Sequence, residues 1–180
     1  NLRGVKESIV VLTPIFIMFL VTHLIVIACG IFSHGSELPG LLNTTMAETR
    51  EGIGAIGLLA MSGIFLRAFC LGGGTFTGIE AVSNGLQILR EPRVTTGKRT
   101  MKYMAFSLAL TAGGILVAYV LNGVQHVEGR TMNAVLVHGL TEKWPGGHIF
   151  LLVTLLSEGA LLLVAAQAGF LYGPRLMSNM

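Results

Sequence analysis

Apolar residues gather along the chain in long runs that are separated by short polar segments. Three of these runs, at about residues 9–32, 104–121 and 149–172, contain at most one charged side chain each. An α-helix needs about 20 predominantly apolar residues to cross the hydrocarbon core of a bilayer. The pattern therefore predicts three unbroken transmembrane helices.

A fourth apolar run, from Ile53 to Leu89, is too long for one straight crossing. As a single helix it would extend about 55 Å at 1.5 Å per residue, whereas the bilayer core is about 30 Å thick. Three successive glycines, Gly72 to Gly74, lie inside the run, and Gly weakens a helix by about 1 kcal/mol relative to Ala. We therefore predict a discontinuous crossing at about residues 63–89 that is broken at 72–78.

The polar connections carry further predicted elements. Residues 33–45 contain glycine, proline and asparagine, which are typical of a loop. Residues 46–63 mix charged side chains with a glycine-spaced apolar run, which predicts a short outer helix that lies at the membrane surface or leads into the next crossing. Residues 133–140 predict a second short surface helix in the connection before the last crossing.

Composition and charge support this organisation. The chain has 52% hydrophobic and 12% charged residues, whereas soluble domains carry about 25% charged residues. We therefore predict an all-α integral membrane protein with four transmembrane helices and no soluble domain. Basic residues gather in the terminal segments and at 90–102, so the positive-inside rule predicts that both ends of the chain are cytoplasmic.

The same charge pattern bears on localisation and partners. The net charge of +3 does not indicate a nucleic-acid partner, because such a partner needs basic residues clustered on one face of a soluble domain. Basic residues that flank membrane helices instead report topology. We expect a multi-pass protein of the cytoplasmic membrane, with the lipid bilayer as its immediate partner.

The predicted break is the strongest candidate for a binding site. One half-helix ends in carbonyl groups and the next begins with free N–H groups, so together they can hold a cation and an anionic group. Thr75 and Thr77 add hydroxyl groups, Phe76 can cover a substrate, and Gly78 lets a ligand approach the backbone just before the second half-helix begins near Ile79. The alternative interpretation is a glycine-rich kink that serves helix packing alone.

Glu80 is the most informative single residue of this stretch. Its carboxylate lies in the first turn of the predicted second half-helix, where the helix dipole stabilises it, while burial opposes ionisation. Glu80 can ligate a cation or exchange a proton during transport. It can also merely pair with a cation on a helix outside this chain.

Two further ionisable groups lie inside predicted crossings. Glu158 has no basic residue near it in its own helix, and a charge at the bilayer centre costs about 3 kcal/mol or more. We expect it to be protonated, hydrated or paired, with Arg67 as a possible partner; Arg67 can also snorkel or form an outer gate. His23 is either a functional group or a neutral imidazole bonded to a carbonyl or hydroxyl on a neighbouring helix.

Enzymatic sites are not indicated. The glycine run at 72–78 lacks the Lys-Ser/Thr that would make it a phosphate-binding loop. His126, His138 and His148 are too dispersed to predict a metal site, and the chain contains no Asp for a Ser/His/Asp arrangement. We therefore predict no enzymatic activity, no metal and no cofactor.

The stretch T-F-T-G-I-E-A-V-S-N-G at residues 75–85 resembles the sixth, unwound helix of the amino acid, polyamine and organocation (APC) transporter superfamily. Residues 1–8 look like the lead into the fifth helix of that family, and residues 173–180 are similar to the segment after the eighth. The resemblance implies a fragment with helices five to eight of a five-plus-five inverted-repeat fold. It is closest to the bacterial amino acid permease branch and its potassium-importing relatives.

The resemblance also implies roles for individual residues. It places residues 75–79 at the substrate-facing stretch, and in potassium-importing relatives the residues matching Thr77 and Glu80 would face the ion. The eighth helix of the family often lines the coupling-ion site, which makes Ser157 and Glu158 secondary candidates. The helices of the parent chain that complete the binding site would lie outside this sequence.

The function predicted from these observations is part of a secondary active transporter of the amino acid permease type. Its partners would be a small-molecule or ion substrate and a coupling cation or proton, and it would operate by alternating access, as a symporter or as an antiporter. One alternative is a potassium importer of the same fold. Another, from a different class, is a non-transporting membrane scaffold or receptor subunit in which the glycines serve only helix packing.

Overall fold

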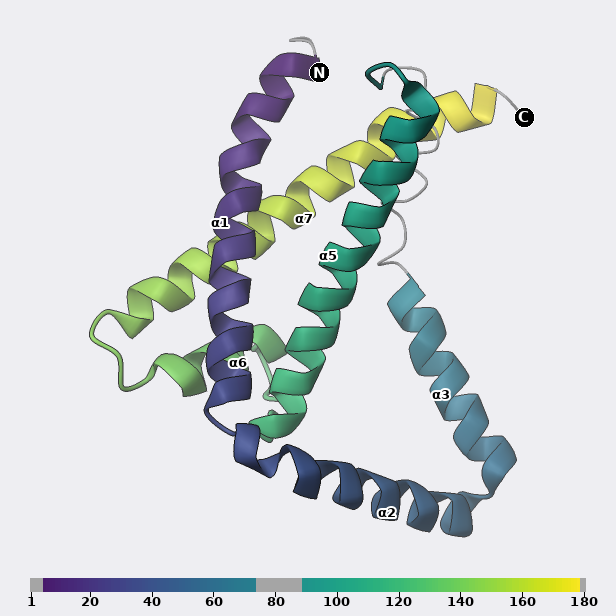
Figure 1. Cartoon of the computed structure of the whole chain (residues 1–180), viewed down its shortest axis with the longest axis vertical. Coiled ribbons are helices and arrows are strands. Elements are labelled where there is room, and N and C mark those ends of the chain that lie inside the picture. The colour runs from purple at the N-terminus through teal and green to yellow at the C-terminus, as the bar shows by residue number, and fades with distance from the viewer. Residues whose placement is uncertain (1–4, 74–88, 179–180) are drawn as a thin grey trace. The chain divides into compact units, whose positions relative to one another are not determined.

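A computed structural model describes residues 5–73 and 89–178 of the chain (Figure 1). The described residues form helices, turns and short connections and contain no strand, which confirms the all-α prediction. The chain divides into two compact units, Asn1–Ser33 with Val117–Met180 and His34–Leu116. Most of the predicted break, residues 74–78, lies outside the described residues.

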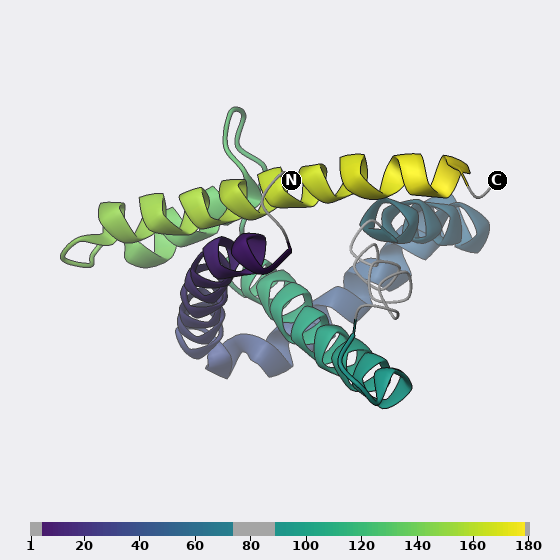
Figure 2. The ribbon, with the colours of Figure 1, turned by 90° about the horizontal axis from the view of Figure 1, so that it is seen from above.

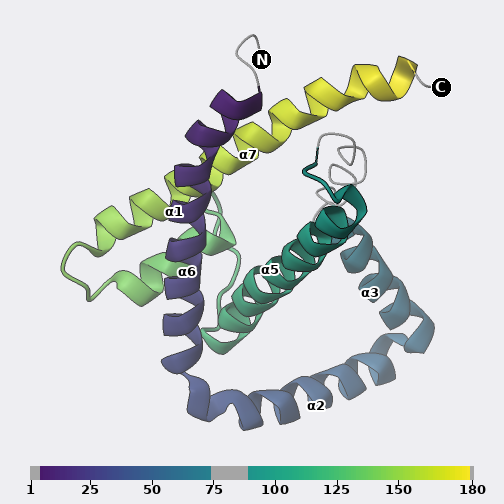
Figure 3. The ribbon, with the colours of Figure 1, turned by 45° about the horizontal axis from the view of Figure 1, so that its top comes forward.

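The first unit is built from α1 (Val5–Phe32), α6 (Met132–Thr141), α7 (Gly147–Ser178) and the last residues of α5 (Arg93–Leu121). Helices α1, α6 and α7 contact one another pairwise. Figure 2 shows α6 running beside α7, and Figure 3 shows α1 passing across both. This three-helix contact encloses the core of the unit.

Helix α6 confirms the short helix that the sequence predicts over residues 133–140. Leu136 and Val137 are 2% and 1% exposed, because α6 packs against α1 and α7. The start of α6 is fixed by Thr131, whose hydroxyl accepts from the Ala134 N–H at 3.1 Å. Such an N-cap satisfies one of the donors that the first turn leaves unpaired.

A close contact joins α1 to the end of α5. A Cβ atom at Gly30 would lie 2.9 Å from the Cβ of Ala118, so only glycine fits at this point of α1. The Asn122 side-chain amide strengthens the contact, because its Nδ2 donates to the Gly30 carbonyl at 3.0 Å and to the Ala118 carbonyl at 2.8 Å.

The second unit contains η1 (Gly35–Glu37), α2 (Leu38–Ile56), α3 (Leu58–Gly72) and most of α5. The prediction of a loop over 33–45 is wrong from Leu38 onward. Pro39 lies in the first turn of α2, where its missing N–H costs no hydrogen bond and its fixed φ suits the helix. A proline that indicates a loop in the sequence thus begins a helix instead.

Helices α2 and α3 meet at Gly57 and are bent by 118° relative to each other (Figure 3). Gly57 has φ +83° and ψ +156°, a backbone conformation that is essentially restricted to glycine. The long apolar run after Ile53 is therefore interrupted near its beginning. The sequence pattern predicts a break only at 72–78, and the last residue of α3 is Gly72.

Among the described residues, three helical segments are long and apolar enough to cross a bilayer: Leu12–Phe32, Arg93–Leu121 and Gly147–Ala166. The bent pair of α2 and α3 is a candidate fourth crossing. Large apolar side chains such as Phe69 and Leu162 are 62% and 71% exposed, as expected for surfaces that lipid or other helices cover. The chain is a multi-pass membrane protein.

Candidate functional site

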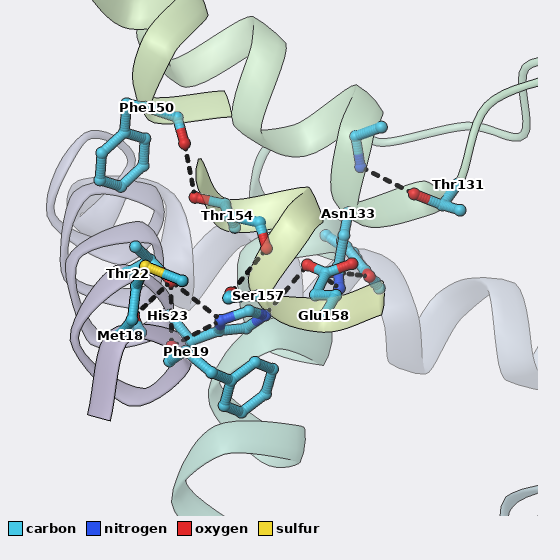
Figure 4. A network of polar contacts seen from close by, with 12 residues as sticks. Met18, Phe19, Thr22, His23, Thr131, Asn133, Phe150, Thr154, Ser157 and Glu158 are labelled. Atoms are coloured by element: carbon cyan, nitrogen blue, oxygen red, sulfur yellow. Dashed lines mark hydrogen bonds and ion pairs between the residues drawn. The ribbon is translucent and has the colours of Figure 1, made fainter. Parts of the chain in front are cut away.

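A buried polar cluster lies in the first unit, where four helices meet (Figure 4). Its members are His23 on α1, Tyr119 on α5, Asn133 on α6 and Glu158 on α7. His23 Nε2 lies 3.1 Å from Glu158 Oε1, and the two side chains are 4% and 16% exposed. The pair therefore joins two membrane helices through groups that are largely removed from water.

The orientation of the His23 ring is set by its own helix. His23 Nδ1 lies 2.8 Å from the carbonyl oxygen of Phe19, one turn earlier, and the His23 and Phe19 ring centroids are 3.8 Å apart. A carbonyl oxygen only accepts hydrogen bonds, so Nδ1 carries a hydrogen. Nε2 is thereby turned toward α7 as the atom that can gain or lose a proton.

Two donors converge on one oxygen of Glu158. Asn133 Nδ2 donates to Oε1 at 2.9 Å, beside the contact from His23 Nε2. The Asn133 carbonyl oxygen in turn accepts from the Tyr119 hydroxyl. Because one carboxylate oxygen can accept two hydrogen bonds, the geometry suits an ionised Glu158 facing an imidazolium.

The proton count of the pair explains how the membrane interior accommodates Glu158. With Nδ1 protonated, the contact between Nε2 and Oε1 needs one further proton. Whether that proton resides on His23 or on Glu158, the net charge of the pair is zero. A buried charge is strongly unfavourable unless it is paired and hydrogen-bonded, and this arrangement satisfies both conditions.

Ser157 and Thr154 lie on the same stretch of α7 and are fully buried. The Ser157 hydroxyl donates to the Thr154 carbonyl at 2.7 Å, and the Thr154 hydroxyl donates to the Phe150 carbonyl at 2.8 Å. Both hydroxyl hydrogens are thus used within α7. The coupling-ion role of Ser157 stays a prediction.

The other predicted site residues fall into two groups. Thr75, Phe76, Thr77, Gly78, Ile79 and Glu80 lie outside the described residues. Arg67 is exposed on α3, which belongs to the other unit. Its gate role and its pairing with Glu158 stay predictions, and Glu158 has a basic partner without it.

His23 and Glu158 were each predicted from the sequence, but their pairing was not. The imidazole does bond to a carbonyl, as one alternative for His23 expected, but that carbonyl belongs to α1 itself and the neighbouring helix contributes Glu158. A signal was available, since each residue is the lone ionisable group of an otherwise apolar crossing and so needs a partner. Nothing in the sequence indicated Asn133 or Tyr119.

Over all 180 residues the chain is 28% identical to a protein of Bacillus subtilis (strain 168) named potassium transporter KimA, and it spans 28% of the length of that protein. No protein-family model and no solved structure matches the chain. The similarity supports a relationship to membrane transporters and points away from an enzyme.

Proposed function

We propose that the chain is part of a secondary active transporter whose cargo is a monovalent cation, with potassium as the first candidate. The observation that carries this proposal is the similarity to a potassium transporter, which covers all 180 residues of the chain. The bilayer-length helices support it, because a transport path through a membrane needs several packed crossings.

In this proposal the cargo is held at the predicted break, on sequence grounds alone. Thr77 and Glu80 would offer hydroxyl and carboxylate oxygens, and the C-terminal end of the preceding half-helix would offer backbone carbonyls. Oxygen ligands of this kind replace the hydration shell of an alkali cation. Transport would proceed by alternating access, in which packed helices rock around a fixed site near the bilayer midplane.

An amino acid is the second candidate cargo. It is favoured by the segment T-G-I-E-A-V-S-N at residues 77–84, which is similar to the unwound helix of bacterial amino acid permeases. The positive end of the second half-helix would then face the substrate carboxylate, as in transporters with discontinuous helices.

Growth rescue separates the two cargoes. The full-length protein is expressed in a bacterial strain that lacks its own potassium uptake, and growth is followed at limiting potassium. We expect rescue by the wild type and its loss in Glu80→Gln at unchanged membrane abundance. Failure of the wild type to rescue growth, combined with accumulation of a labelled amino acid in the same cells, would assign the site to amino acids.

A further inference from the structure

We propose that His23 and Glu158 form a binding site for one exchangeable proton, and that this proton holds α1, α6 and α7 together. The proposal goes beyond the transport function, since it concerns the buried cluster of the first unit and does not depend on the cargo. Its starting point is the 3.1 Å contact between Nε2 and Oε1, two atoms that attract each other only while a proton lies between them.

Loss of the shared proton turns the attraction between His23 and Glu158 into repulsion. The Phe19 carbonyl keeps the hydrogen on Nδ1, so a deprotonated His23 turns the lone pair of Nε2 toward the carboxylate of Glu158. Two acceptors then face each other at hydrogen-bond distance, and the buried cluster carries a net negative charge. We expect the α1–α7 contact to open in this state.

Gain of a second proton also weakens the contact. The proton would add to the Glu158 carboxylate, leaving an imidazolium against a neutral acid and removing the Coulomb attraction between the two side chains. Glu158 is the more accessible partner, with 16% of its side chain exposed against 4% for His23. The proton therefore enters and leaves through Glu158.

Among the described side chains of the first unit, the ionisable groups around His23 and Glu158 do not offer a second buried proton site. From α5 the Tyr119 hydroxyl faces the cluster through Asn133, and α6 contributes only the neutral Asn133 amide. Among the side chains of this unit that the structure describes, the other charged or imidazole groups are exposed: His126, Glu128, Arg130, His138, Glu142, Lys143 and His148. Their exposure sets these groups apart from the buried pair.

Helix α6 is the element that responds to the protonation of the His23–Glu158 pair. Asn133 lies in its first turn, two residues after the N-cap Thr131, and donates to the same Oε1 that His23 contacts. A change in the charge or position of Glu158 is therefore transmitted directly to the start of α6. By the charge pattern, α6 belongs to an outer connection, so the proton would control how firmly this connection is held on the crossings.

Hydrogen–deuterium exchange of the full-length protein in nanodiscs tests whether the shared proton holds α6 on α1 and α7. Labelling times are scaled for the intrinsic pH dependence of exchange, and protection of α6 is followed as the pH is raised. We expect protection to fall in the wild type and to be independent of pH in His23→Gln and Glu158→Gln, whose amides keep hydrogen-bonding capacity but do not titrate. His138→Gln, at an exposed histidine of the same helix, is the matched control and should retain the wild-type profile.

Infrared difference spectroscopy of the wild type provides a test that does not require stable variants at every site. A step to high pH should give the imidazole signal of His23 deprotonation together with a shift of the carboxylate band of Glu158, and the carboxylate shift should vanish in Glu158→Gln. An α6 protection profile in Glu158→Gln that still follows the wild type would overturn the proposal, as would a wild-type spectrum in which the imidazole signal has no carboxylate shift beside it. Neither result depends on whether potassium is the cargo, so this proposal and the proposed function fail separately.

Discussion

At the scale of single residues, the Glu158 carboxylate accepts from His23 on one helix and from Asn133 on another. Each donor is itself held, His23 by the Phe19 carbonyl and Asn133 by the Tyr119 hydroxyl. An ionisable group in an apolar bundle is stable only if such a network is complete. The replacement of any one residue of this network therefore leaves another buried polar group without its partner.

Removal of the amide at position 133 tests this dependence. Asn133→Leu keeps the branched shape of the side chain but leaves Glu158 with one donor fewer and the Tyr119 hydroxyl without its acceptor. A buried group that loses its partner costs about 1–3 kcal/mol, so the thermal unfolding temperature of the purified full-length protein should fall. Asn43→Leu, at an exposed position of α2, is the control, and equal unfolding temperatures for both variants would contradict the network.

The contact at Gly30 gives a second prediction at this scale. In Gly30→Ala the new methyl group meets the Cβ of Ala118 at 2.9 Å, and neither atom can rotate away. Overpacking of this kind costs about 1–3 kcal/mol. Gly113→Ala, in α5 with no heavy atom near the added Cβ, should be neutral or stabilising in the same unfolding assay. A Gly30→Ala protein as stable as Gly113→Ala would show that α1 and α5 do not approach closely.

At the scale of elements, glycine and proline decide where helices start, bend and end. Pro39 begins α2, and Gly57 separates α2 from α3 with a bend of 118°. The turn between α6 and α7 is equally restricted, because a Cβ at Gly147 would overlap the Thr141 carbonyl oxygen. These backbone requirements, more than propensity, set the directions of the helices.

The bend at Gly57 predicts an unequal effect of alanine at two neighbouring glycines. Gly57→Ala places a side chain at φ +83°, which costs about 1–3 kcal/mol. Gly54→Ala lies within α2 with open space around the new Cβ, where alanine favours the helix by about 1 kcal/mol. The two unfolding temperatures should therefore move in opposite directions, and a shift of the same sign would place the bend elsewhere.

The same elements show what the sequence could predict. The three unbroken crossings were predictable because bilayer length and lack of charge define them almost alone. The bend at Gly57 was not, since Gly54 and Gly63 lie in the same run and nothing in the sequence distinguishes Gly57 from them. The burial of α6 was missed for a related reason, because a short helix with apolar residues on one face is compatible with either a lipid surface or a protein surface.

For the site, the sequence could not predict which side chains pair in space. The length and charge of the crossings indicate that His23 and Glu158 need partners, but not that α1 and α7 bring them to 3.1 Å. The contribution of Asn133 depends on α6 packing against both helices. No local pattern in the sequence encodes that arrangement.

At the scale of the whole molecule, charge bias predicts the orientation of the crossings. Basic residues gather at 90–102 and at both termini, so these segments should face the cytoplasm. In a full-length protein from which every native cysteine has been removed, Cys29 and Cys70 included, a single cysteine introduced at Lys98 should react only with a membrane-permeant thiol reagent in intact cells. A cysteine at Gly129, in the opposite connection, should react with an impermeant reagent, and the reverse pattern would invert the topology.

The most direct test of the transport assignment is cation flux through the purified full-length protein in proteoliposomes. Radioactive rubidium serves as the tracer for potassium, and Glu80→Gln reconstituted at equal density is the comparison. The proposal predicts rubidium accumulation that excess potassium suppresses and that falls to the level of empty vesicles in Glu80→Gln. Wild-type vesicles that take up no rubidium under any imposed ion gradient would contradict it.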